Sequence, residues 1–214
     1  MGIATTGKPV RIAVLCSGGG SNLQALFDAI DAGAIAGNVV LVLANRSKAF
    51  ALERARTRGV PAVFVSKLQA GSDAAYNDAI LAELRAHGAE LVVLAGYLPM
   101  VGPQVVSAYA GRILNIHPSL IPSFCGRGMY GIHVHEAVLA YGAKISGATV
   151  HFVDDGADTG PIIMQRSVPV EESDDAHALQ ARVLVVEHDI LPRCVAAFCA
   201  GKITVDGRCV TVVQ

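Results

Sequence analysis

The segment RILNIHPSLIPSFCGRG, residues 112–128, begins like a buried strand and ends in a run that neither a strand nor a helix accommodates. Asn115 and His117 stand two positions apart at the end of its apolar stretch, and Pro118 and Pro122 then interrupt backbone hydrogen bonding. Residues at positions i and i+2 of an extended segment point the same way. We therefore expect this strand to deliver both polar side chains to the edge of an α/β sheet, where such enzymes hold their chemistry.

Apolar runs alternate with helical patterns on the N-terminal side of this segment. The expected strands are residues 10–16, 39–43, 62–65, 91–96 and 112–115, and the expected helices are 23–33, 50–58, 73–87 and a short one after Pro103. Strands that alternate with helices in this way predict right-handed βαβ units. The fold class is therefore α/β, a single Rossmann-like domain with a mostly parallel, doubly wound sheet.

The pattern changes after residue 131. A helix is expected over 133–141, then two strand-like stretches around the GADTG turn, which predict a strand pair ending the sheet. A long helix follows over 174–200, with an interruption at Pro192. The segment KITVDGRCVTVV, residues 202–213, predicts a hairpin with an Asp206-Gly207 turn. Because no linker, repeat or low-complexity tract appears, residues 1–214 are expected to form one domain.

Composition and charge limit the classes of partner. The 17 basic and 18 acidic residues give a net charge of −1, which provides no overall field to attract nucleic acid or a membrane surface. Small-molecule substrates remain the expected partners, with the choice between monomer and homodimer left open. Five cysteines without a CxxC pair indicate reduced thiols. The N-terminal segment MGIATTGKPVRIAVLC lacks the features of a signal peptide, so a cytoplasmic location is expected.

A glycine-rich loop, Ser17 to Asn22, stands between the first strand and the first helix. Glycines let the backbone approach a ligand, and the free N–H groups at a helix start attract an anion. A tight turn with Ser21 or Asn22 as the N-cap would also explain the loop, but three consecutive glycines exceed what capping requires. No Lys-Ser/Thr pair follows, and Leu23 occupies the third glycine position of a dinucleotide fingerprint. The loop therefore suits a single phosphate.

The amide of Asn115 and the imidazole of His117 can together serve a carbonyl group, because one stabilises a developing oxyanion and the other moves a proton. Asp158, in DDGADTGP, is the best candidate for a partner that the fold returns to the same sheet edge. We expect its carboxylate to favour the imidazolium of His117 and so raise the pKa of that ring.

The other histidines give weaker signals. His133 and His135 suggest a metal site with His117, but the pair straddles a helix start without an HExxH motif or a cysteine framework. No metal is therefore expected. His151 lies inside an apolar strand and is interpreted as a hydrogen-bonded structural histidine.

Together these segments resemble the folate-dependent glycinamide ribonucleotide formyltransferases. The matching stretches, in family order from residue 11 to about residue 192, are RIAVLCSGGGSNLQAL, ANRSKAFALERA, VVLAGYLPMV, GRILNIHPSLIPSF, GATVHFVDDGADTGPII and ARVLVVEHDILP. The resemblance implies transfer of a formyl group from 10-formyltetrahydrofolate, a co-substrate, to the glycine amine of the ribonucleotide. It also implies a phosphate-binding half at about 10–100 and a catalytic and folate-binding half at about 91–200.

The resemblance also implies roles for individual residues. The family's catalytic trio falls on Asn115, His117 and Asp158. The implied reaction passes through a tetrahedral oxyanion, which Asn115 and His117 stabilise. The remaining implied contacts are Gly20, Ser21, Asn22 and Glu187 for the nucleotide, and Leu98, Pro99, Met100, Val101 and Asn115 for folate.

This chain departs from some relatives at two places. Asp73 stands where they have a folate-contacting arginine, and the loop SFCGRGMYG, residues 123–131, is longer and glycine-rich, which predicts a mobile lid. The alternatives are a formyltetrahydrofolate hydrolase, another formyltransferase of this fold, or a nucleotide-binding module without catalysis.

Overall fold

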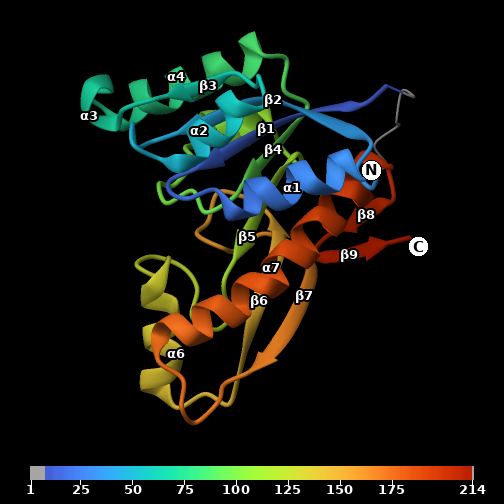
Figure 1. Ribbon diagram of the computed structural model, residues 1–214. Coiled ribbons are helices and arrows are strands. Elements are labelled where there is room, and N and C mark those ends of the chain that lie inside the picture. Colours follow the sequence, from blue (N-terminus) through green and yellow to red (C-terminus); the bar gives the residue numbers. More distant parts are fainter. Residues whose placement is uncertain (1–7, 214) are drawn as a thin grey trace.

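A seven-stranded sheet in the order β3-β2-β1-β4-β5-β6-β7 runs through the structure, a computed structural model that describes residues 8–213 (Figure 1). The strands are β1 (Val10–Cys16), β2 (Gly37–Ala44), β3 (Ala62–Phe64), β4 (Leu91–Leu94), β5 (Ile113–His117), β6 (Ile145–Phe152) and β7 (Ile162–Pro169). The first five pair in parallel, whereas β6 and β7 add to β5 in antiparallel fashion. This confirms the predicted α/β sheet and its antiparallel end.

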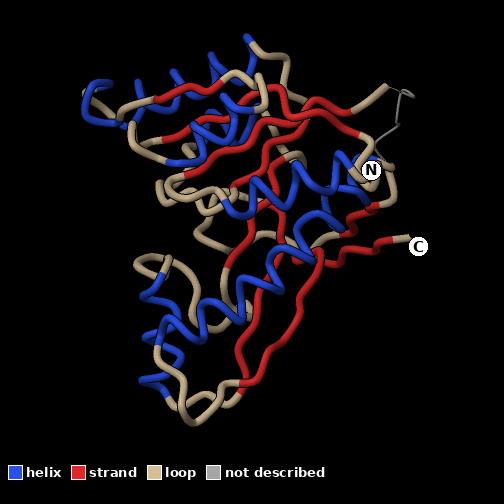
Figure 2. The backbone as a smooth tube through the Cα atoms, in the orientation of Figure 1, coloured by secondary structure: helices blue, strands red, loops and turns tan. Residues whose placement is uncertain are grey.

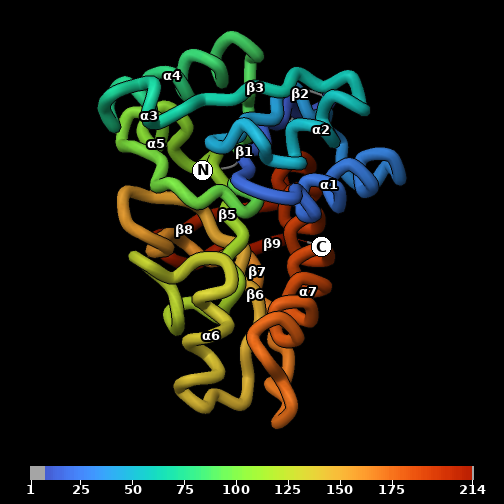
Figure 3. Tube along the Cα trace, turned by 60° about the vertical axis from the view of Figure 1, so that its left-hand side comes forward, coloured from blue at the N-terminus to red at the C-terminus, as the bar shows by residue number. Residues whose placement is uncertain are grey.

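Helices cover both faces of the sheet, as Figures 2 and 3 show. They are α1 (Ser21–Asp31), α2 (Phe50–Thr57), α3 (Lys67–Ala70), α4 (Asp73–Ala86), α5 (Pro103–Ala108), α6 (Ile132–Tyr141) and α7 (Ala176–Cys199). Successive strand residues alternate between faces. Val14 accordingly belongs to the core under α1, α2 and α7, and Leu15 to the core under α4 and α5. No helix within residues 8–213 combines the length and the apolar character needed to cross a membrane.

Strand β5 is longer than the sequence predicts, and the expected end at Asn115 is wrong. The antiparallel neighbour β6 pairs with β5 from Leu114↔Phe152 to His117↔Thr149, so backbone pairing continues to the residue before Pro118. Asn115 and His117 therefore lie within the strand and share one face of it. A paired strand holds their side chains more rigidly than a loop would.

The predicted interruption of the last helix at Pro192 is also wrong, because α7 continues through it. Proline removes one backbone donor and crowds the preceding turn, at a cost of about 3 kcal/mol or more. Around Pro192, the buried side chains of Leu191, Cys194 and Val195 pack into the core. We attribute the continuity of α7 to this burial, since packing of an apolar face supplies most helix stability in proteins.

The C-terminal hairpin forms as predicted, but its turn is shifted by one residue. Strands β8 (Ile203–Asp206) and β9 (Cys209–Val212) pair so that Asp206 lies opposite Cys209. The turn is therefore Gly207-Arg208, with Gly207 at φ 55, at the first central position where a type II′ turn places glycine. The one-turn helix α3 was not predicted. The part of the N-terminal segment before residue 8, on which the signal-peptide expectation rests, lies outside the described residues.

Candidate active site

The fold brings together the three residues that were expected to act as a unit. Asn115 and His117 project from β5, and Asp158 approaches from the loop between β6 and β7. Asn115 Nδ2 lies 3.4 Å from Asp158 Oδ1, and His117 Nδ1 lies 3.6 Å from Asp158 Oδ2. One carboxylate thus faces both polar groups of the strand, each with a different oxygen.

Asp158 is held in place by its backbone and by the glycine-rich loop. Its φ is 57, a left-handed conformation that few residues other than glycine adopt, and Gly126 N–H donates to Oδ2 at 2.9 Å. Strained backbone of this kind concentrates at functional sites. Burial alone would raise the pKa of Asp158, but His151, His117 and the Gly126 N–H outweigh it and lower that pKa. The carboxyl is therefore an anion at neutral pH.

His117 is only 4% exposed, and its two ring nitrogens have different neighbours. Nε2 lies 3.0 Å from the carbonyl oxygen of Phe124, which can only accept, so Nε2 carries a proton. In the neutral ring Nδ1 is therefore the basic nitrogen, and it faces Asp158. Phe124 itself has φ 50, so a second strained residue shapes the same site.

The expectation that Asp158 raises the pKa of His117 above its ordinary value is wrong in its net direction. Burial lowers the pKa of His117 most strongly, and the Asp158 carboxylate and the Phe124 carbonyl raise it only in part. Desolvation disfavours the cation, and here it outweighs the neighbouring charge. The imidazole of the free protein is therefore neutral at pH 7.

His151 belongs to this site, although its sequence context indicated only a structural role. It is the cross-strand partner of Asn115 and is 2% exposed. Nδ1 lies 2.7 Å from the Phe152 carbonyl and so carries the proton, which leaves Nε2 to accept from Asn115 Nδ2 at 3.1 Å. Nε2 is also 3.6 Å from Asp158 Oδ1. No local sequence signal indicates this pairing, because it depends on the register of β6 against β5.

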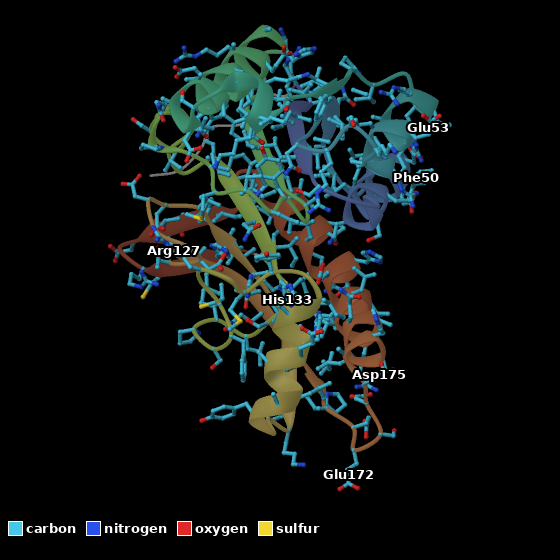
Figure 4. The ribbon with its side chains drawn as sticks, turned by 90° about the vertical axis from the view of Figure 1, so that its left-hand side faces the viewer. Phe50, Glu53, Arg127, His133, Glu172 and Asp175 are labelled. Atoms are coloured by element: carbon cyan, nitrogen blue, oxygen red, sulfur yellow. The ribbon has the colours of Figure 1, made fainter. Side chains whose placement is uncertain are left out.

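The pair His133 and His135 does not assemble with His117 around a metal. His133, at the start of α6 in Figure 4, is exposed and pairs with Glu136 at 2.9 Å. His135 is buried, its Nδ1 has no hydrogen-bond partner among the described residues, and burial, aided by His117, lowers its pKa to about 4. Within residues 8–213 no group of three or more His, Cys, Asp or Glu side chains is placed to hold a metal ion.

A cleft of about 550 Å³ opens beside the trio. Its walls are the segment after β4, the glycine-rich loop before α6 and the loop that carries Asp158. The five residues expected to contact folate all line it: Leu98, Pro99, Met100, Val101 and Asn115. Asp73 also lines the cleft, where it forms an ion pair with Lys67 at 2.7 Å.

The glycine loop ends at Gly20, the N-cap of α1, with φ 69. No side chain caps this helix, so the alternative in which Ser21 or Asn22 is the N-cap is wrong. A Cβ at position 20 would lie 2.8 Å from Ala51 Cβ, so this glycine is required by packing against α2. A Cβ at Gly19 would meet nothing within 4 Å, and this part of the loop is open to a ligand.

The loop is joined to α7 and to the cleft wall by hydrogen bonds. Asn22 Nδ2 donates to Glu187 Oε2 at 2.6 Å, and burial raises the pKa of Glu187 to about 7 despite this bond. Ser17 Oγ accepts from Leu98 N–H at 2.8 Å. The candidate phosphate loop, the cleft and the trio therefore all lie at the carboxyl ends of the parallel strands, where ligands bind in open α/β sheets.

Comparison with known proteins finds relatives of this chain. The model of the family described as formyl transferase matches residues 10–195. Phosphoribosylglycinamide formyltransferase of Escherichia coli is 41% identical over 194 residues, which cover 91% of this chain and 89% of the relative. A chloroplastic phosphoribosylglycinamide formyltransferase of Arabidopsis thaliana is also 41% identical, over 90% of this chain, but the chain spans only 66% of its length.

Solved structures give the same result. The crystal structure of glycinamide ribonucleotide transformylase 1 from Symbiobacterium toebii superposes with a TM-score of 0.92 and 41% identity. The match covers 100% of this chain and 99% of the other.

Proposed function

This chain belongs to the formyl transferase family, and we propose that it transfers the formyl group of 10-formyltetrahydrofolate to the glycine amine of N1-(5-phosphoribosyl)glycinamide, a step of purine synthesis. The observation that carries the proposal is the contact of one carboxylate, Asp158, with both Asn115 and His117 at the edge of the cleft. An amide donor and a basic ring nitrogen side by side are what acyl transfer to an amine requires.

His117 moves the proton in the proposed reaction. When the amine attacks the formyl carbon, its nitrogen becomes positive and must lose a proton. Neutral His117 accepts that proton at Nδ1, because Nε2 already donates to the Phe124 carbonyl. Asp158 stabilises the resulting imidazolium from 3.6 Å. The same proton then passes to the departing folate nitrogen as the carbon–nitrogen bond breaks, which returns His117 to its neutral form.

Asn115 stabilises the oxyanion of the tetrahedral intermediate. Its amide N–H toward His151 Nε2 makes the shorter contact, at 3.1 Å, and keeps the side chain oriented. The N–H toward Asp158 Oδ1 makes a contact of 3.4 Å, which is the weaker bond. We propose that this second N–H donates to the formyl oxygen in the transition state. The weak bond to Asp158 is then replaced by a stronger bond to the developing negative charge, which favours the transition state.

The two substrates occupy neighbouring parts of the same edge. The amides of the loop around Gly20, Ser21 and Asn22 bind the phosphate, and Glu187 accepts hydrogen bonds from the nucleotide. The folate ring lies in the cleft along 98–101, whose volume of about 550 Å³ accommodates it. The proposal thus assigns a phosphate-binding half at about 10–100 and a catalytic half at about 91–200 to one domain over residues 1–214. One sheet, from β1 to β7, joins the two halves.

The main alternative is hydrolysis of formyltetrahydrofolate, which needs the same trio but no nucleotide. Incubation with 10-formyltetrahydrofolate should release tetrahydrofolate rapidly only when the ribonucleotide is added. The matched control is His117→Ala, which should be slow under both conditions. Equal release with and without the nucleotide would identify a hydrolase. No release from either mixture would leave a formyltransferase with another acceptor or a nucleotide-binding module without catalysis.

A further inference from the structure

Arg54, a half-buried residue of α2, makes contacts to the glycine loop that its place on this helix does not require. Its Nε donates to the Gly19 carbonyl at 2.8 Å, and Nη1 donates to Gln24 Oε1 at 2.9 Å. The guanidinium lies over the Phe50 ring, 5.0 Å from its centroid, and Phe50 marks the position of α2 in Figure 4. The side chain is therefore held on three sides, with both of its hydrogen bonds going to the start of α1.

These contacts orient the peptide groups of the loop. Ala51 N–H, also on α2, donates to the Gly18 carbonyl at 3.1 Å, so two successive carbonyls point toward α2. In a trans peptide the N–H points opposite to the C=O. The N–H groups of Gly19 and Gly20 therefore point away from α2. Successive N–H groups presented in this way form an anion-binding concavity.

The charge of Arg54 adds to this effect. Within residues 8–213 its guanidinium makes no ion pair with a carboxylate, and its hydrogen-bond partners are a neutral carbonyl and a neutral amide. Arg54 also lines a groove of about 530 Å³ together with Ser21 and Gln24, next to the start of α1. A cation that forms no ion pair and lies close to the loop strengthens binding of an anion there.

We propose that Arg54 is a positioning residue for the phosphate of the ribonucleotide: it fixes the Gly19-Gly20 peptide so that the Gly20 N–H faces the anion. It thereby makes the enzyme select the phosphorylated substrate over the unphosphorylated ribosylglycinamide. This inference rests on the proposed function for the identity of the substrate. None of the residues expected to contact the substrates lies on α2, so this role is new to that helix.

The test compares Arg54→Ala, Arg54→Lys and the control Arg56→Ala on both substrates. Arg56 is on the same helix and carries the same charge, but it is exposed and pairs with Glu53. Arg54→Ala should raise KM for the nucleotide on the order of tenfold, as loss of a charge-assisted hydrogen bond does, with kcat nearly unchanged. For the unphosphorylated substrate, kcat/KM should not change. Lysine should restore part of the loss, and Arg56→Ala should behave like the parent.

Equal losses on both substrates in Arg54→Ala, or no loss on either, would overturn the role of Arg54. If Arg54→Ala does not fold, Arg54→Lys serves as the variant, because it keeps the charge but cannot make both hydrogen bonds. Should the parent protein transfer no formyl group, the proposed function fails, and calorimetric binding of inorganic phosphate then tests Arg54 separately. Phosphate binding about tenfold weaker in Arg54→Ala than in Arg56→Ala supports the inference, and equal binding contradicts it.

Discussion

His117 Nδ1 and Asp158 Oδ2 lie 3.6 Å apart, although the two residues are 41 positions apart along the chain. Two opposing effects act on the imidazole at this point. Burial disfavours its cation, and the carboxylate favours it. The ring is neutral at rest, so it can accept a proton, and Asp158 supports the charge only while the proton is on the ring. This balance suits a group that takes a proton in one step and returns it in the next.

Asp158→Asn tests this relationship. The variant keeps the shape of the side chain but removes the charge that raises the pKa of His117, so that pKa should fall further. The acid limb of the kcat/KM profile, where the base becomes protonated, should move to lower pH. The plateau should drop on the order of 10²–10³, because the imidazolium formed during turnover is no longer stabilised. The measurement is kcat/KM from pH 5 to pH 9.

A double variant provides the control for this prediction. His117→Ala should cost at least as much as Asp158→Asn, and the two changes together should cost little more than His117→Ala alone, since both act on one proton. Fully multiplicative losses, or an acid limb that stays in place in Asp158→Asn, would show that Asp158 acts independently of His117.

Substitutions of Asn115 and His151 should likewise have effects on kcat that are not independent of each other. Asn115→Ala removes the proposed oxyanion donor, so kcat should fall on the order of 10²–10³ with KM for the nucleotide nearly unchanged. His151→Phe keeps a buried ring but removes the acceptor that orients the Asn115 amide at 3.1 Å. We expect about a tenfold loss of kcat from this change, and almost none when Asn115 is already alanine. Equal effects of His151→Phe in both backgrounds would place His151 outside the catalytic unit.

Because of Glu187, the free energy of unfolding should fall as the pH rises. Folding raises the pKa of this buried carboxyl from 4.5 to about 7, so between those values the folded state holds a proton that the unfolded chain releases. The stabilisation is complete below pH 4.5 and is lost as the pH rises through 7. At 1.36 kcal/mol per pKa unit, the loss is roughly 3 kcal/mol.

Urea unfolding at pH 5 and pH 8 measures this loss when Glu187→Gln, which does not titrate, serves as the reference. The free energy of unfolding of the parent should fall relative to that of the variant by roughly 2.5 kcal/mol between the two pH values, because part of the total loss already occurs below pH 5. A constant difference between the two proteins would mean that Glu187 is ionised in the folded state already at pH 5.

The glycine loop offers a matched pair of substitutions. Gly20→Ala places a Cβ 2.8 Å from Ala51 Cβ at φ 69, so the melting temperature should fall. Gly19→Ala meets no neighbour within 4 Å, so the fold should tolerate it while the methyl group obstructs the phosphate. We expect a higher KM for the nucleotide in Gly19→Ala without a change in melting temperature. Parental KM in that variant would remove Gly19 from the phosphate site.

The sequence was sufficient to predict the parts of the fold that depend on local patterns. Alternating apolar runs predict the sheet, and the i, i+2 spacing of Asn115 and His117 predicts their common face. What remained hidden depends on long-range pairing. The antiparallel register that extends β5 also places His151 opposite Asn115, and no local pattern near residue 151 reveals that partner.

The sign of the His117 pKa shift could not be predicted for a similar reason. A neighbouring carboxylate is visible as a motif, whereas burial of the ring to 4% exposure results from many residues that pack around it. The role of Gly20 was likewise hidden, because its constraint is the contact with Ala51 on a separate helix.

The fate of an isotopically labelled formyl carbon tests the central claim most directly. The protein is mixed with stoichiometric 10-formyltetrahydrofolate carrying ¹³C in the formyl group and with the ribonucleotide, and the products are followed by ¹³C NMR. We predict that the label appears in an amide on the glycine nitrogen of the nucleotide, one label for each folate consumed, and that His117→Ala abolishes the signal. Label recovered as free formate, in an amount independent of the nucleotide, would contradict the account.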